Sequence, residues 1–211
     1  MTAAGVTVVE HPVAQHKLTL LRRAATPPSQ FRRTLRELGA LLAYEALRDL
    51  PVAAVRIETP VAEMDASEIA QGTLAVVSIL RAGNGLADGV SDLLPDVPVG
   101  HIGLRRNETT LKPERYYLNL PRGIGRARVL LVDPMLATGG SAADAIDQLR
   151  AAGVRELRFV CVLAAPEGLA HMAERHPDVP VVTAAIDNRL NEVGYIVPGL
   201  GDAGDRLYGT V

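Results

Sequence analysis

The sequence is poor in cysteine and in aromatic residues, and these absences exclude several classes of protein. Among its 211 residues there is one cysteine and no tryptophan, and aromatic side chains make up 3%. An internal disulfide is therefore impossible, and the apolar run around Cys161 predicts a buried, inert thiol in a reducing compartment. The scarcity of aromatic rings argues against a platform that stacks nucleic-acid bases.

Long hydrophobic segments and an excess of one charge are also missing. No apolar run is long enough to span a membrane, and the N-terminus lacks the basic and apolar segments of a signal peptide. The formal net charge of −2 argues against a nucleic-acid or membrane partner, although it allows a small basic pocket for an anion. We therefore expect a cytoplasmic protein.

From residue 74 onward, apolar runs are continuous rather than alternating, as in strands that are covered on both faces. They lie at residues 74–80, 128–133, 158–165 and 180–187. Helix-like segments between them lie at residues 86–94, 141–153 and 166–177. This alternation predicts a single α/β domain over residues 1–211, with an open, mainly parallel sheet and flanking helices.

The remaining segments complete this prediction. Residues 26–50 have the spacing of an amphipathic helix, and residues 49–61 predict a short strand pair or an edge region. Residues 99–104 and 116–120 predict an antiparallel pair, joined by a long polar loop at 105–115 that could serve as a lid. The glycine-rich C-terminal segment excludes a long helix there.

Three unusual loops follow predicted strands, at the edge where open α/β sheets bind ligands. In the first, residues 78–85, Arg81 could bind an anion, while Gly83 and Gly85 would leave backbone amides open to it. The alternative is a glycine turn with a solvated arginine, and the loop taken alone favours that alternative.

The second loop combines Asp133, at a strand end, with Thr138, Gly139, Gly140 and Ser141 at a helix start. Amides at a helix N-terminus suit a phosphate, and two hydroxyls add donors. The alternative is Ser141 as an ordinary N-cap, with glycines for turn geometry. The absence of a following lysine, and of the G-x-G-x-x-G spacing, argues against a P-loop and a dinucleotide site.

The third loop, residues 194–205, places four glycines around Asp202 and Asp205. Exposed peptide groups could match the edge of a flat polar heterocycle. The alternative is a disordered tail, which would waste the apolar side chains of this segment. Those side chains are Tyr195, Ile196, Val197 and Leu200.

The second loop carries a resemblance to a known family. "VLLVDPMLATGGSAADAI" resembles the phosphoribosyl-diphosphate (PRPP) motif of type I phosphoribosyltransferases, with Pro134 where a second acid is usual. That variant is similar to uracil phosphoribosyltransferases, as are "RNETTLKP", "AAPEG" and "NEVGYIVPGLGDAGDRLYGT". The resemblance runs from about His11 to the C-terminus. Asn84, in "LRAGNG", is a departure from the usual "LRAGLG".

The resemblance implies that uracil and PRPP react to give UMP and pyrophosphate, with Arg106 and Asp202 as the catalytic residues. The implied PRPP site comprises Arg81, Arg106, Asp133, Pro134, Met135, Leu136, Ala137, Thr138, Gly139, Gly140, Ser141 and Asp202. The implied uracil site comprises Ile196, Gly201, Asp202 and Ala203. Mg²⁺ would be held mainly through PRPP rather than by direct protein ligands.

The resemblance also implies a type I phosphoribosyltransferase fold with an antiparallel flexible-loop arm and a small hood from the terminal segments. It further implies a homo-oligomer, either dimer or tetramer, and a GTP effector. Three other functions compete with this one. A phosphoribosyltransferase for another base conflicts with the uracil-type tail, and an RNA-binding regulator of the same fold would need a basic face. A binding module without catalysis would leave both arginine loops unexplained.

Overall fold

A computed structural model describes residues 5–70, 72–106 and 113–210. Within these residues, eight strands form one sheet in the order β1-β10-β9-β7-β4-β5-β6, with β8 beside β9. All neighbours are parallel except β5 and β6, which confirms the predicted sheet and its antiparallel pair. The strands are β1 Val6–Val8, β4 Leu74–Leu80, β5 Val99–Arg106, β6 Pro113–Asn119, β7 Arg128–Val132, β8 Met135–Leu136, β9 Glu156–Ala164 and β10 Val181–Ile186.

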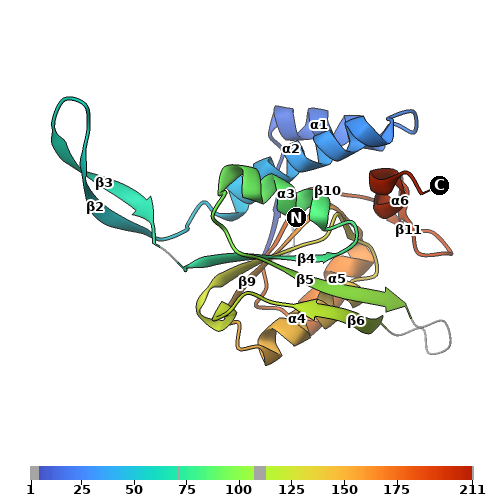
Figure 1. The fold of residues 1–211 in the computed structure, drawn as a ribbon. Coiled ribbons are helices and arrows are strands. Elements are labelled where there is room, and N and C mark those ends of the chain that lie inside the picture. Colours follow the sequence, from blue (N-terminus) through green and yellow to red (C-terminus); the bar gives the residue numbers. More distant parts are fainter. Residues whose placement is uncertain (1–4, 71, 107–112, 211) are drawn as a thin grey trace.

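Helices cover both faces of the sheet, with α1, α2 and α3 on one face and α4 and α5 on the other (Figure 1). Their bounds are α1 Pro12–Arg22, α2 Pro28–Ala46, α3 Asn84–Leu93, α4 Gly140–Ala151 and α5 Pro166–Arg175. The sequence pattern did not reveal α1, because its buried stripe is only three residues: Ala14, Leu18 and Leu21. No described helix is long and apolar enough to cross a membrane.

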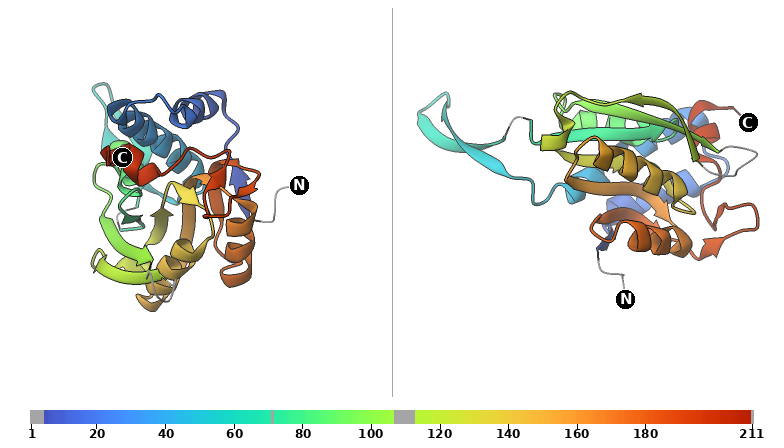
Figure 2. Two further views of the ribbon diagram at one scale, coloured as in Figure 1. Left: turned by 90° about the vertical axis from the view of Figure 1, so that its right-hand side faces the viewer. Right: turned by 90° about the horizontal axis from the view of Figure 1, so that it is seen from below.

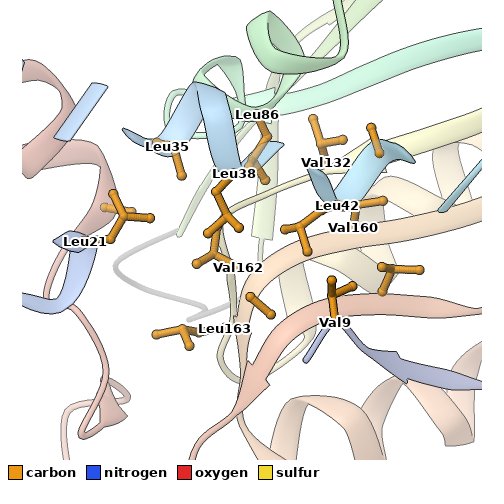
Figure 3. Packing of buried hydrophobic residues seen from close by; sticks show 14 of the residues in the cluster. Val9, Leu21, Leu35, Leu38, Leu42, Leu86, Val132, Val160, Val162 and Leu163 are labelled. Carbon is orange, nitrogen blue, oxygen red and sulfur yellow. The ribbon is translucent and has the colours of Figure 1, made fainter. Parts of the chain in front are cut away.

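The continuous apolar runs are explained by two core clusters, one on each face of the sheet. Along β4, Leu74 and Val76 belong to the cluster under α2, while Ala75 and Val77 belong to the cluster under α4. Because alternate side chains point to opposite faces, each face of a covered strand must be apolar. Figure 3 shows the α2 side of this core, where three leucines meet the central strands. The labelled leucines of α2 are Leu35, Leu38 and Leu42.

Strands β2, Val52–Glu58, and β3, Glu63–Ile69, form a hairpin that is a separate two-stranded sheet. The predicted strand pair at residues 49–61 therefore contains only β2, because its partner β3 lies beyond that range, and the pair is not an edge of the main sheet. The hairpin extends away from the rest of the molecule (Figure 2). It lies at the opposite end from α6, Ala203–Tyr208, which follows the short strands β11, Arg189–Leu190, and β12, Ile196–Val197 (Figure 1).

Helix α3, which begins directly after the Arg81 loop, packs very closely on α2. A Cβ atom at Gly89 would lie 2.1 Å from the carbonyl oxygen of Arg36 and 2.8 Å from the amide nitrogen of Ala40. Both atoms belong to the backbone and cannot move aside as a side chain can. The position of α3, and so of the loop before it, therefore depends on a glycine at this site.

We expect Gly89→Ala to lower the free energy of unfolding by about 1–3 kcal/mol, because the added methyl group forces α3 away from α2. Urea unfolding measures this, and Asp88→Ala, on the exposed side of the same helix, is the control. An unchanged unfolding midpoint for Gly89→Ala would show that the two helices are less tightly packed than described.

Candidate active site

The order of the strands places a topological switch point at the carboxyl ends of β4 and β7. These two strands are neighbours, but the chain continues from β4 to β5 on one side and from β7 to β9 on the other. At such a switch point the outgoing connections diverge, which opens a ligand site between them. Ser78 pairs in register with Val132, so the loops carrying Arg81 and Asp133 begin side by side.

The Arg81 loop is packed against the end of β7 by a glycine. A Cβ atom at Gly83 would lie 2.5 Å from the carbonyl oxygen of Val132 and 2.6 Å from that of Ile79, so no side chain fits there. Asn84 begins α3 and accepts a hydrogen bond of 2.7 Å from the fully buried hydroxyl of Ser78. Asn84, where the family usually has a leucine, thus connects the loop to the strand that precedes it. The side chain of Arg81 stays 57% exposed.

The T-G-G-S loop leaves the first turn of α4 open. Gly139 is the N-cap, with a φ of 83°, and has no side chain to cap the helix, while the first amide, that of Gly140, donates only a long hydrogen bond of 3.5 Å to the hydroxyl of Thr138. The N-cap interpretation of Ser141 is therefore wrong, because Ser141 lies inside the helix. A Cβ atom at Gly139 would come within 3.0 Å of the Gly168 carbonyl oxygen, so the loop lies tight on α5. Uncapped amides at a helix start, next to the exposed Thr138 and Ser141, suit an anion.

Asp133 directly follows β7 at the switch point and is half-buried. Loss of solvent, with a smaller contribution from the carboxylate of Asp202, raises the pKa of its carboxyl group to about 7. A hydrogen bond of 3.4 Å from the amide of Met135 opposes this shift. A Cβ atom at Gly204 would lie 3.2 Å from a carboxylate oxygen of Asp202 and 3.8 Å from the guanidinium group of Arg81, so the third loop lies against the first.

The glycine-rich third loop is ordered, and it presents mainly backbone. The side chain of Ile196 is buried in the core, whereas Gly201, with a φ of 80°, and Asp202 are exposed. The carboxylate of Asp202 accepts a hydrogen bond of 2.9 Å from the amide of Asp205 and so caps α6. The disordered-tail alternative is therefore wrong.

Three charged residues that the sequence did not single out hold this terminal segment in place. Arg22 of α1 pairs with the buried Asp187 at 2.5 Å and donates to the carbonyl oxygen of Gly199 at 2.9 Å. Arg206 stacks over the ring of Phe31 at 4.5 Å and donates to backbone carbonyls of α1 and the residue after it. These contacts form the predicted hood. No local signal could reveal Arg22 and Asp187 as partners, because 165 residues separate them.

The structure brings four of the predicted elements to one edge, namely Arg81, Asp133, the 138–141 loop and Asp202. The backbone of Arg106 ends β5, but its side chain lies outside the described part of the molecule, as do residues 107–112. Among the described residues, no group of three or more His, Cys, Asp or Glu side chains could hold a metal. Cys161 is buried and inert as predicted, since burial raises the pKa of its thiol to about 12.

Comparison of the sequence with known proteins identifies the family of this chain. The family model described as uracil phosphoribosyltransferase matches residues 8–210. The chain belongs to the uracil phosphoribosyltransferase family. Among curated members, the protein of Paracoccus denitrificans is 57% identical over 210 residues, which cover 100% of both chains. The protein of Brucella anthropi is 55% identical, with 98% of this chain and 99% of that protein covered.

Solved structures show the fold. A protein of Aquifex aeolicus is 37% identical and has a TM-score of 0.91, with 96% of this chain and 97% of that chain covered. Adenine phosphoribosyltransferase of Trypanosoma brucei has a TM-score of 0.59 at 13% identity, over 88% of this chain and 84% of that chain. The latter likeness shows the fold alone, which is the expected type I phosphoribosyltransferase fold.

We expect Asp133→Asn to stabilise the ligand-free protein at high pH. The folded-state pKa of about 7 lies above the usual unfolded value near 4, so ionisation of Asp133 destabilises the fold as the pH rises through this window. In urea unfolding at pH 8, the free energy of unfolding of the variant should exceed that of the parent by on the order of 1–4 kcal/mol. This difference should disappear toward pH 4. Asp96→Asn, at an exposed carboxyl group, is the control. An equal gap at both pH values would contradict burial of Asp133 as its cause.

Proposed function

We propose that this chain performs the reaction named by its family at the β4–β7 edge, transferring the 5-phosphoribosyl group from PRPP to uracil. The products are UMP and pyrophosphate. The observation that carries this proposal is the meeting of three loops at one edge. One loop presents a guanidinium group, one an uncapped helix start, and one exposed backbone beside a carboxylate.

The 5′-phosphate would bind at the start of α4. Its acceptors would meet the amides of the 138–141 loop and the hydroxyls of Thr138 and Ser141, in the field of the helix dipole. The segment Pro134–Ala137 carries this loop and would line the PRPP site with its backbone. Asp133 would accept hydrogen bonds from the ribose hydroxyls. Burial raises the pKa of Asp133, but a bound cation nearby would favour the ionised form of this residue.

Pyrophosphate leaves as the bond from C1 of the ribose to its oxygen breaks, so negative charge grows on the leaving group. Arg81 and Arg106 would stabilise that charge with preorganised donors. Further neutralisation of the pyrophosphate would come from a bound Mg²⁺. The two carboxyl groups at this edge, Asp133 and Asp202, fit a cation that is held mainly by substrate oxygens and water.

Uracil would be recognised by backbone groups of Ile196, Gly201 and Ala203. The buried side chain of Ile196 supports recognition by its backbone rather than by its side chain. As N1 forms the bond to C1 of the ribose, its proton would pass to Asp202, directly or through a water molecule. Asp202 is exposed and close enough to Asp133 to affect the pKa of that residue.

A spectrophotometric assay with PRPP and Mg²⁺ tests this function, with uracil, cytosine, hypoxanthine and orotate offered separately. We expect turnover with uracil and little with the other bases. Turnover with another base alone would favour a different phosphoribosyltransferase. Binding of RNA at physiological salt without any turnover would favour a regulatory protein instead.

We expect Arg106→Ala to lower kcat/KM in both directions by about 10²- to 10³-fold, the effect of removing one donor from a developing charge. UMP binding should change less, because UMP lacks the pyrophosphate that Arg106 would contact. Steady-state kinetics of synthesis and pyrophosphorolysis measure the first effect, and calorimetry with UMP measures the second. Parent rates in both directions would remove Arg106 from the mechanism.

The β2–β3 hairpin supports a homo-oligomer, either dimer or tetramer. One of its faces pairs Ile57 with Met64 and Val55 with Ala66, and Met64 is 46% exposed. An isolated two-stranded hairpin is marginally stable in water, so this apolar face favours cover by a second copy of the chain.

Cytoplasmic location, a GTP effector and a single domain over residues 1–211 stay predictions.

We expect Met64→Asp to shift the assembly toward the monomer, since a buried, unpaired carboxylate opposes association. Light scattering after size-exclusion chromatography measures the mass of the parent and the variant. Glu58→Gln, on the charged face of the same hairpin, should assemble like the parent. An unchanged mass for Met64→Asp would place the interface elsewhere.

A further inference from the structure

Arg81 is held by the terminal helix α6 through three different contacts. Its guanidinium group lies 3.5 Å from a carboxylate oxygen of Asp205 and 5.6 Å from the centre of the Tyr208 ring. The hydroxyl of Tyr208 also donates a hydrogen bond of 3.1 Å to the carbonyl oxygen of Arg81. An ion pair, a cation–π contact and a backbone hydrogen bond thus converge on one residue.

Helix α6 is itself fixed at both ends, so these contacts are made from a firm support. Its start is capped by Asp202, and the carbonyl oxygen of Leu207 accepts a hydrogen bond of 2.8 Å from Arg32 of α2. The side chain of Leu207 also packs against the Arg81 loop, where a Cβ atom at Gly85 would come within 3.3 Å of it. The position of α6 therefore determines where Asp205 and Tyr208 can hold Arg81.

We propose that Asp205 and Tyr208 are positioning residues that hold Arg81 ready for the pyrophosphate end of PRPP. An exposed arginine loses much rotamer freedom when it binds an anion, and a side chain that is already oriented loses less. The Tyr208 ring and the Asp205 carboxylate would limit that freedom without burying the charge. This inference rests on the proposed function only for the identity of the ligand.

Calorimetry with Mg²⁺–pyrophosphate tests the proposal without requiring turnover. Asp205→Asn should weaken binding about two- to fivefold, the range for a partly exposed ion pair. Tyr208→Ala should weaken it by a similar factor, about two- to fivefold, through loss of the cation–π contact. Tyr208→Phe keeps the ring and loses only the hydroxyl, so it should restore binding to within about twofold of the parent.

Two controls separate positioning from general damage. Asp92→Asn breaks an exposed ion pair with Arg36 at the far end of α3 and should leave pyrophosphate binding unchanged. Thr210→Val removes the hydrogen bond of 2.6 Å that Thr210 donates to Asp205, and it should retain parent binding if the carboxylate acts through Arg81.

Kinetics supply a readout that a purely structural role would not give. In Asp205→Asn and Tyr208→Ala, the KM for PRPP should rise while the KM for uracil and the melting temperature stay near the parent values. Parent-like or tighter pyrophosphate binding in both variants would overturn the proposal, as would an equal rise in both KM values. Absence of uracil turnover in the parent would instead refute the proposed function. The affinities of the parent and the variants for Mg²⁺–pyrophosphate would still test whether Asp205 and Tyr208 position Arg81.

Discussion

The pairing of β4 with β7 is the constraint on which the site depends. Both strands are buried on their two faces, so their register cannot slip without exposing the core. That register places the loop after Leu80 beside the loop after Val132. Gly83 then lets one loop lie directly on the last carbonyl of the neighbouring strand. The cationic loop and the acidic loop meet because two strands far apart in sequence are adjacent.

The edge that results is not optimised for stability. Asp133 loses solvent on folding, and its raised pKa shows that ionisation there is unfavourable in the ligand-free protein. The N-cap of α4 is a glycine, which cannot cap the helix with a side chain, although a capping side chain would stabilise the helix by about 1 kcal/mol. Both features are what a ligand with phosphate groups and a bound cation would complete. The two apolar clusters beneath the helices supply the stability that these features do not.

The terminal segment shows how a glycine-rich sequence can be held in a defined shape. Arginines from opposite ends of the chain anchor it, through the Arg22–Asp187 pair and through Arg206 on Phe31. Helix α6 then serves several purposes at once. Its N-cap residue, Asp202, contributes to the raised pKa of Asp133, and the helix presents Asp205 and Tyr208 to Arg81. A change in this segment would therefore affect the loops on two neighbouring strands as well as its own backbone.

Local patterns in the sequence predicted strands β4 to β7, β9 and β10, helices α2 to α5 and the three loops, because burial on one or both faces imposes a periodicity on neighbouring residues. They also pointed to Arg81, Asp133 and the T-G-G-S loop, whose residue types suit an anion wherever they fold. Tertiary structure alone decided that the hairpin stands apart, that Ser141 does not cap α4, and which residues hold Arg81 and the tail. The last of these outcomes depends on contacts between residues more than a hundred positions apart, such as Tyr208 with Arg81, and no local pattern records such a contact.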